Sequence, residues 1–159
     1  MVLAHSLGGH IMSNYIWDRQ CGRQPSLLLP LWPIPTLAGL VTFGCNIPLF
    51  ALAYRAAKPI DLPGSAITKP EVIDATRWLN FTDKDDVLGW PLRPLYAKDY
   101  PDLTPAQQQT VNKLEDYEIR VGSFATGWTP AAHDGYWTDD DFVSPVADYL
   151  QRLLAAIDA

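Results

Sequence analysis

The chain has little that would suit it to nucleic acids or membranes. Its 159 residues carry 12 lysines and arginines against 18 aspartates and glutamates, a formal net charge of −6. A protein that binds nucleic acid needs a basic surface, so we expect no nucleic-acid partner. The sequence holds no apolar run of about 18 residues, and we expect no membrane-spanning helix. No basic and apolar leader is visible either, which predicts a cytoplasmic protein.

Cysteine is scarce, and the familiar metal and cofactor motifs are missing. Cys21 and Cys45 lie far apart with no metal-type spacing, so we expect two free thiols, with a disulfide as the less favoured alternative. The sequence contains no G-x-G-x-x-G, P-loop, C-x-x-C or H-E-x-x-H. The acidic run 139–141 lies near the start of a predicted helix, where carboxylates interact favourably with the helix dipole. We therefore predict neither a metal nor a cofactor.

The hydrophobic pattern predicts one α/β domain over residues 1–159. Hydrophobic residues make up 48% of the chain, which is ordinary for a globular protein. Strands are predicted over residues 2–4, 37–43, 77–82 and 119–124. Helices are predicted over residues 9–20 and 105–114, and from residue 138 or 144 to the C-terminus. Alternating strands and helices predict a three-layer α/β/α fold with a mainly parallel sheet.

The most informative stretch is the N-terminal one. The predicted strand Val2–Ala4 runs into His5-Ser6-Leu7-Gly8-Gly9, and a helical pattern follows at once. A sharp strand-to-helix turn would lift the Ser6 hydroxyl clear of the backbone. It would also direct the first N–H groups of the helix at an oxyanion formed there. We expect Gly8 to let neighbouring backbone approach closely. The alternative is an unrelated three-layer domain in which Ser6 only caps the helix.

The segment Ala4-His5-Ser6-Leu7-Gly8 resembles the G-x-S-x-G nucleophile elbow of α/β-hydrolases, with Ala4 in place of the first glycine. The resemblance spans the whole chain in order and looks most like lipase- and esterase-type members. It implies a catalytic triad in the order serine, acid, histidine. The acid is expected after the predicted strand 77–82. There, Asp85-Asp86-Val87-Leu88 fits the frame D-x-[VI]-[VL], which selects Asp85, with Asp83 and Asp86 as the alternatives.

The base implied by the resemblance is His133, which lies in the loop before the last predicted helix. Ser6 would attack an ester carbonyl, His133 would take its proton, and Asp85 would hold His133 in the right tautomer. The N–H of Leu7 would be one oxyanion donor. A histidine without a role and solvated turn aspartates are the alternative interpretation. The residues expected to line the substrate site are His5, Trp90, Tyr136 and Trp137.

The resemblance also implies strands and a second oxyanion donor upstream of the elbow. The chain therefore looks like the C-terminal half of a truncated hydrolase fold, and its first strand would have an open edge. We expect a homodimer or a docking partner at that edge, or a longer parent protein. The sequence thus predicts a serine hydrolase that cleaves a small-molecule carboxylic ester and whose activity the missing donor would lower. The alternative is a non-catalytic interaction module on the same scaffold.

Overall fold

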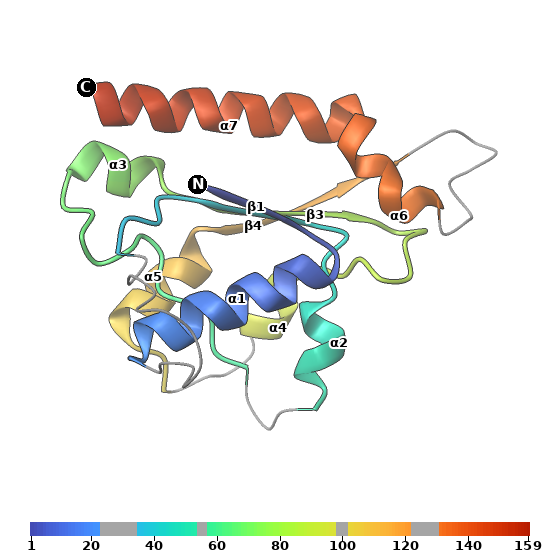
Figure 1. The fold of residues 1–159 in the computed structure, drawn as a ribbon, viewed down its shortest axis with the longest axis horizontal. Helices are drawn as coiled ribbons and strands as arrows, with labels where there is room; N and C mark the ends of the chain where they lie inside the picture. The colour runs from blue at the N-terminus through green and yellow to red at the C-terminus, as the bar shows by residue number, and fades with distance from the viewer. Residues whose placement is uncertain (23–34, 54–56, 98–101, 122–130) are drawn as a thin grey trace, which may run out of the picture.

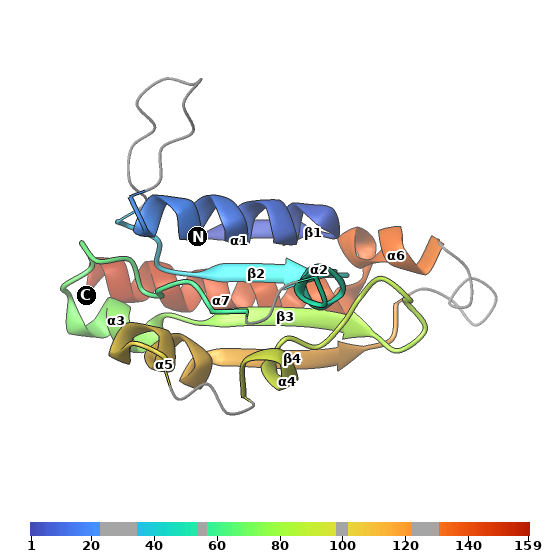
Figure 2. The same cartoon turned by 90° about the horizontal axis from the view of Figure 1, so that it is seen from below.

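The computed structural model contains one parallel sheet of four strands. It describes residues 1–22, 35–53, 57–97, 102–121 and 131–159. The strands are β1 (Val2–His5), β2 (Leu40–Phe43), β3 (Trp78–Asp83) and β4 (Leu114–Ile119), in the spatial order β1-β2-β3-β4. Each strand pairs in parallel with the next one along the chain. The predicted parallel α/β sheet is therefore confirmed, and all the strands end at the same edge (Figure 2).

Helices cover both faces of this sheet, which gives three layers (Figure 1). One face carries α1 (Leu7–Gln20), α2 (Ile47–Ala51), α4 (Arg93–Ala97) and α5 (Pro105–Asn112). The other face carries α3 (Pro70–Ala75) and the long C-terminal helix α7 (Asp140–Asp158). The short helix α6 (Ala131–Gly135) and the 3-10 turn Tyr136–Thr138 lie near the carboxyl ends of the strands.

The alternation of strand side chains explains the two cores. Successive residues of a strand point to opposite faces, so each face of the sheet buries its own set. Leu40, Trp78 and Leu114 occupy matching register positions on one face and belong to a core cluster with Ile16 of α1. The cluster on the α7 face contains Val41, Phe43, Leu79, Phe81, Phe142, Val146 and Tyr149. The strands are thus held between two apolar layers.

The prediction of the fourth strand was wrong. The observed β4 is Leu114–Ile119, whereas the predicted strand began at residue 119, and residues 122–124 lie outside the described residues. The strand was missed because it lies at a sheet edge and carries charged residues. Those charges have partners, since Glu115 forms an ion pair with Arg77 and Asp116 accepts a hydrogen bond from Asn80.

The other boundaries differ from the predictions by a few residues. Strand β2 begins at Leu40, helix α5 ends at Asn112, and α1 begins at Leu7, directly after Ser6. Helix α5 begins with a capping box, in which Thr104 and Gln107 bond reciprocally. Helix α7 begins between the two predicted starts because the Asp139 side chain accepts a hydrogen bond from the Asp141 N–H and caps it.

Three further predictions bear on the surface and the thiols. Both cysteines are free, as expected, and burial raises the pKa of the Cys45 thiol to about 12. None of the helices in the described parts of the chain is long and apolar enough to span a bilayer. Among the described residues β1 pairs only with β2, so its outer edge carries no strand. A partner at that edge stays a prediction.

Candidate active site

The candidate site lies where three strands end. Ser6 follows β1, Gly44 follows β2, and the loop that contains Asp86 follows β3. The parallel register sets His5 beside Phe43 and Phe43 beside Phe81, so these segments begin side by side. Helix α6 brings His133 to the same edge (Figure 2). Residues that are far apart in the sequence therefore meet at the carboxyl edge of the sheet.

The backbone of Ser6 adopts a strained conformation. Its φ of 54° and ψ of −128° place it alone among the described non-glycine residues at positive φ. Such a conformation costs on the order of 1–3 kcal/mol and persists only where the surroundings hold it. Here the Ser6 N–H donates to the Phe43 carbonyl at 3.0 Å, and the Ser6 carbonyl accepts from the Gly9 N–H at 3.0 Å. The predicted strand-to-helix turn is thus confirmed.

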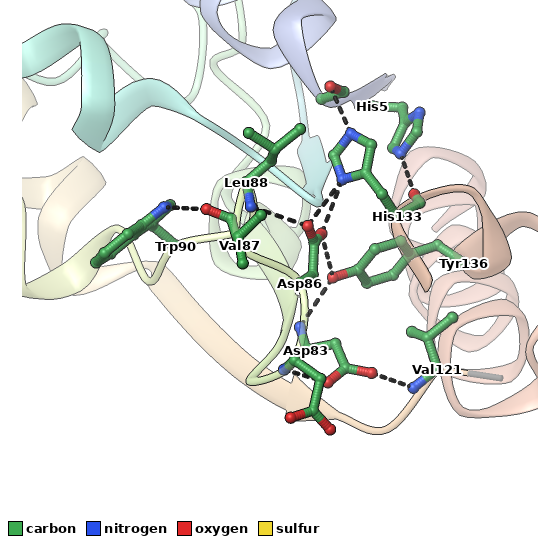
Figure 3. A network of polar contacts seen from close by, with 11 residues as sticks. His5, Asp83, Asp86, Val87, Leu88, Trp90, Val121, His133 and Tyr136 are labelled. Carbon is green, nitrogen blue, oxygen red and sulfur yellow. Dashed lines mark hydrogen bonds and ion pairs between the residues drawn. The ribbon is translucent and has the colours of Figure 1, made fainter. Parts of the chain in front are cut away.

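Three side chains form a continuous hydrogen-bonded line (Figure 3). The Ser6 Oγ lies 2.6 Å from Nε2 of His133, and Nδ1 of His133 lies 2.9 Å from Oδ2 of Asp86. A carboxylate can only accept, so Nδ1 carries the hydrogen and Nε2 of the neutral ring accepts from the Ser6 hydroxyl. The Asp86 side chain is 1% exposed and that of His133 14%. This arrangement suits a nucleophile beside a base.

The selection of Asp85 as the acid was wrong, because the carboxylate against His133 belongs to Asp86. The turn after β3 decides this. The Asp83 carboxylate accepts from the N–H groups of Asp85 and Val121, and the Asp86 N–H donates to the Asp83 carbonyl. These bonds direct the Asp86 side chain inward. The Asp85 carboxylate is partly exposed and lies 4.0 Å from the Lys84 ammonium.

Close packing confines the Asp86–His133 pair. The Asp86 Oδ1 also accepts from the Leu88 N–H at 3.0 Å. A Cβ at position 89 would lie 2.8 Å from Asp86 Oδ2, and one at Gly44 would lie 3.0 Å from Cε1 of His133. Both positions are glycine in this chain. Neither glycine was predicted as a site residue.

His5 lies against the site, where its ring contacts the backbone carbonyl of His133. Its Nε2 lies 2.7 Å from the His133 carbonyl, and its ring stacks on Phe43 with centroids 5.0 Å apart. A carbonyl can only accept, so Nε2 of His5 carries a hydrogen. Burial lowers the pKa of His5, which favours the neutral ring. His5 therefore holds the segment that presents His133.

The aromatic residues predicted to line the site have three different positions. Tyr136 is fully buried and donates a hydrogen bond to Asp86, so its prediction as a lining residue was wrong. Trp137 is 54% exposed and meets Phe43 edge-on at 4.8 Å, at the margin of the site. Trp90 is 45% exposed and donates to the Val87 carbonyl. It lies at the end of the loop after β3 that is far from His133 (Figure 3).

Gly9, and not Gly8, allows the close approach that the sequence suggested. A Cβ at Gly9 would lie 2.6 Å from the Cys45 Sγ, whereas one at Gly8 would have no neighbour within 4 Å. The helical spacing could have predicted this close approach, because Gly9 lies seven residues before the buried Ile16 and therefore on the same face of α1. Leu7 begins α1, and the first N–H groups of a helix have no partner within it.

Comparison with known proteins adds no identification. Models of protein families, curated protein sequences and solved structures all gave no match to this chain. Within the described ranges, no group of three or more histidine, cysteine or acidic residues is arranged to hold a metal ion.

We predict that Gly9→Ala and Gly8→Ala have opposite effects on stability. The methyl group of Gly9→Ala meets a buried thiol, so α1 has to shift. The free energy of unfolding should therefore fall by about 1–3 kcal/mol. Gly8→Ala adds a helix-favouring residue in open space and should raise the free energy of unfolding by about 0.5–1 kcal/mol. Urea unfolding followed by circular dichroism measures both. Equal stability of the two variants would contradict the packing described for α1.

Proposed function

We propose that this chain is a serine hydrolase of the α/β-hydrolase type that cleaves carboxylic esters. The observation that carries the proposal is the contact of the Ser6 hydroxyl with Nε2 of His133, with Asp86 bonded to the opposite side of the ring. The strained turn at Ser6 supports it, since such conformations cluster at functional sites. The chain order serine, acid, histidine and the consecutive parallel strands agree with the hydrolase resemblance.

In the proposed reaction the Ser6 oxygen attacks the ester carbonyl while His133 takes the hydroxyl proton at Nε2. Asp86 keeps the other ring proton on Nδ1 and offsets the positive charge that forms on the imidazole. The Leu7 N–H, at the start of α1, stabilises the oxyanion. His133 then protonates the leaving alcohol, and an acyl-enzyme remains on Ser6. A water molecule, activated by the same ring, releases the acid and restores the hydroxyl.

The surroundings of the site favour an ester with an apolar group. Large apolar side chains are exposed on the segments that follow three strands and on the turn after α6; they include Leu7, Phe50, Leu88, Trp90 and Trp137. These residues follow the carboxyl ends of the strands, on the side where Ser6 lies. An apolar acyl or aromatic group would remove such side chains from water, which is favourable.

The open edge of β1 is the second part of the proposal. We propose that a strand from a second copy of the chain, or from a docking partner, pairs with this edge. A non-catalytic interaction module is the second candidate, because β1 pairs only with β2 among the described residues and an unpaired strand edge can accept a strand of another chain. The two free thiols favour a reducing compartment, and we propose the cytoplasm.

A fluorophosphonate probe tests the proposal directly. It should modify the wild-type protein at Ser6, and Ser6→Ala should abolish the modification. Ser13→Ala is the matched control, because Ser13 lies on the same helix and its hydroxyl donates to the His10 carbonyl. Intact-mass and peptide mass spectrometry locate the adduct. A wild-type protein that never acquires the adduct would favour the interaction module.

We predict that the two neighbouring aspartates differ sharply in their effect on ester hydrolysis. Asp86→Asn removes the acceptor that fixes the His133 tautomer and should lower kcat by roughly 10³–10⁴-fold. Asp85→Asn changes a partly exposed carboxylate and should leave kcat within about twofold, since exposed ion pairs contribute little. Hydrolysis of a short-chain aryl ester measures both. A large loss in Asp85→Asn with normal turnover in Asp86→Asn would overturn the assignment.

A further inference from the structure

We propose that Tyr136 is a positioning residue for the Asp86–His133 pair, holding the carboxylate and sharing its charge through a hydrogen bond from the phenol. The inference rests on the proposed function, and it concerns a residue whose hydroxyl bonds to Asp86 and not to the nucleophile or the base among the described contacts. Its action passes entirely through Asp86. Figure 3 shows the Tyr136 hydroxyl directed at the Asp86 carboxylate.

The direction of the hydrogen bond follows from its partners. The Asp83 N–H lies 2.8 Å from the Tyr136 hydroxyl oxygen and can only donate, so the oxygen accepts there. The same hydroxyl lies 3.1 Å from Asp86 Oδ2, which can only accept. The single phenolic proton therefore points at Asp86. The backbone amide of Asp83 orients the phenolic oxygen. Among the described contacts of the hydroxyl, Asp86 is the acceptor toward which its proton can point.

Burial keeps this donor in place and protonated. Tyr136 is 0% exposed, and its ring lies among Phe43, Phe142 and His5 with centroids about 6 Å away. Such a ring cannot swing away without opening the core. Burial, reinforced by the nearby Asp86 charge, raises the pKa of Tyr136 well above its usual range. The phenol therefore remains a donor at every pH at which the protein is studied.

The donor acts on a carboxylate that faces the imidazole with both oxygens. Nδ1 of His133 lies 2.9 Å from Oδ2 and 3.0 Å from Oδ1 of Asp86, and Tyr136 bonds to Oδ2. A hydrogen bond to a charged acceptor is stronger than one between neutral groups, so it spreads the carboxylate charge and limits rotation of the side chain. Without the phenol, the carboxylate should attract the imidazolium more strongly and orient the ring less well. The first effect raises the pH at which His133 titrates, and the second lowers kcat.

Several other titratable groups surround His133, and removal of the Tyr136 hydroxyl leaves their charges unchanged. Asp86 faces it from the loop after β3, and His5 faces it from β1 with ring centroids 4.7 Å apart. Asp134 is its neighbour on α6, and Asp83 lies behind Tyr136 with its carboxylate bonded to backbone N–H groups. A substitution of Tyr136 alters none of these charges.

The test compares Tyr136→Phe with Tyr149→Phe in the full chain. Tyr149 is also buried, and its hydroxyl accepts from the Arg77 N–H, but it lies at the opposite end of the strands. Nuclear magnetic resonance titration of the imidazole signals measures the midpoint of each of the three histidines, with His133→Gln as the assignment reference. We expect the His133 midpoint to rise by about half a pH unit in Tyr136→Phe and to stay at the wild-type value in Tyr149→Phe.

Kinetics supply the second readout. In Tyr136→Phe, kcat on an aryl ester should fall about tenfold with KM unchanged, because the substrate does not touch Tyr136. The titration needs no turnover, so a protein that fails to hydrolyse esters but shows the shift would refute the proposed function and support this inference. An unchanged His133 midpoint in Tyr136→Phe, or an equal shift in Tyr149→Phe, would overturn it.

A second variant covers the case in which Tyr136→Phe does not fold. Site-specific incorporation of 3-fluorotyrosine at position 136 keeps the ring and the hydroxyl but makes the phenol a stronger donor. The His133 midpoint should then fall below the wild-type value, opposite in sign to the effect of removing the hydroxyl. A midpoint that does not move with the fluorinated residue would overturn the inference.

Discussion

The backbone conformation of Ser6 is the constraint on which the rest of the site depends. Residues other than glycine rarely adopt a positive φ, as Ser6 does here. Two backbone hydrogen bonds hold this conformation, one from Ser6 to Phe43 at the end of β2 and one from Gly9 in α1 to Ser6. The first continues the pairing of β1 with β2, and the second lies in the first turn of α1, which Gly9 lets lie close to the sheet. The strain is therefore offset by packing of the sheet and its first helix, and it directs the hydroxyl toward His133.

The remaining parts of the site differ in how firmly the fold holds them. Ser6 directly follows β1, so the parallel register places it, and Asp86 follows β3 through a turn that the Asp83 carboxylate holds. His133 comes from the short helix α6 and depends on contacts made by its own side chain and carbonyl with Asp86, Ser6 and His5. The His133 ring is thus positioned by polar contacts, whereas the Ser6 hydroxyl is positioned by the backbone. The buried hydroxyl of Tyr136 adds a further support behind the carboxylate.

Much of this arrangement could be predicted from the sequence, and the failures have physical causes. The hydrophobic patterns located the first three strands and the strand-to-helix pattern located Ser6, whereas His133 was selected from the hydrolase resemblance alone. The choice among three acids depends on which backbone N–H groups the Asp83 carboxylate accepts, which no local frame encodes. Strand β4 was missed because partners distant in sequence satisfy its charges. An aromatic residue near a histidine does not reveal whether it faces solvent or the core, as Tyr136 illustrates.

The central claim is that Ser6 is a nucleophile activated by His133. The most direct measurement is the second-order rate constant for phosphonylation of Ser6 as a function of pH, in the wild type and in His133→Gln. The account predicts that the wild-type rate constant rises with pH as one proton is lost and then levels off. In His133→Gln it should be lower by roughly 10³-fold or more and should show no such plateau. Equal rate constants in the two proteins across the pH range would contradict the account.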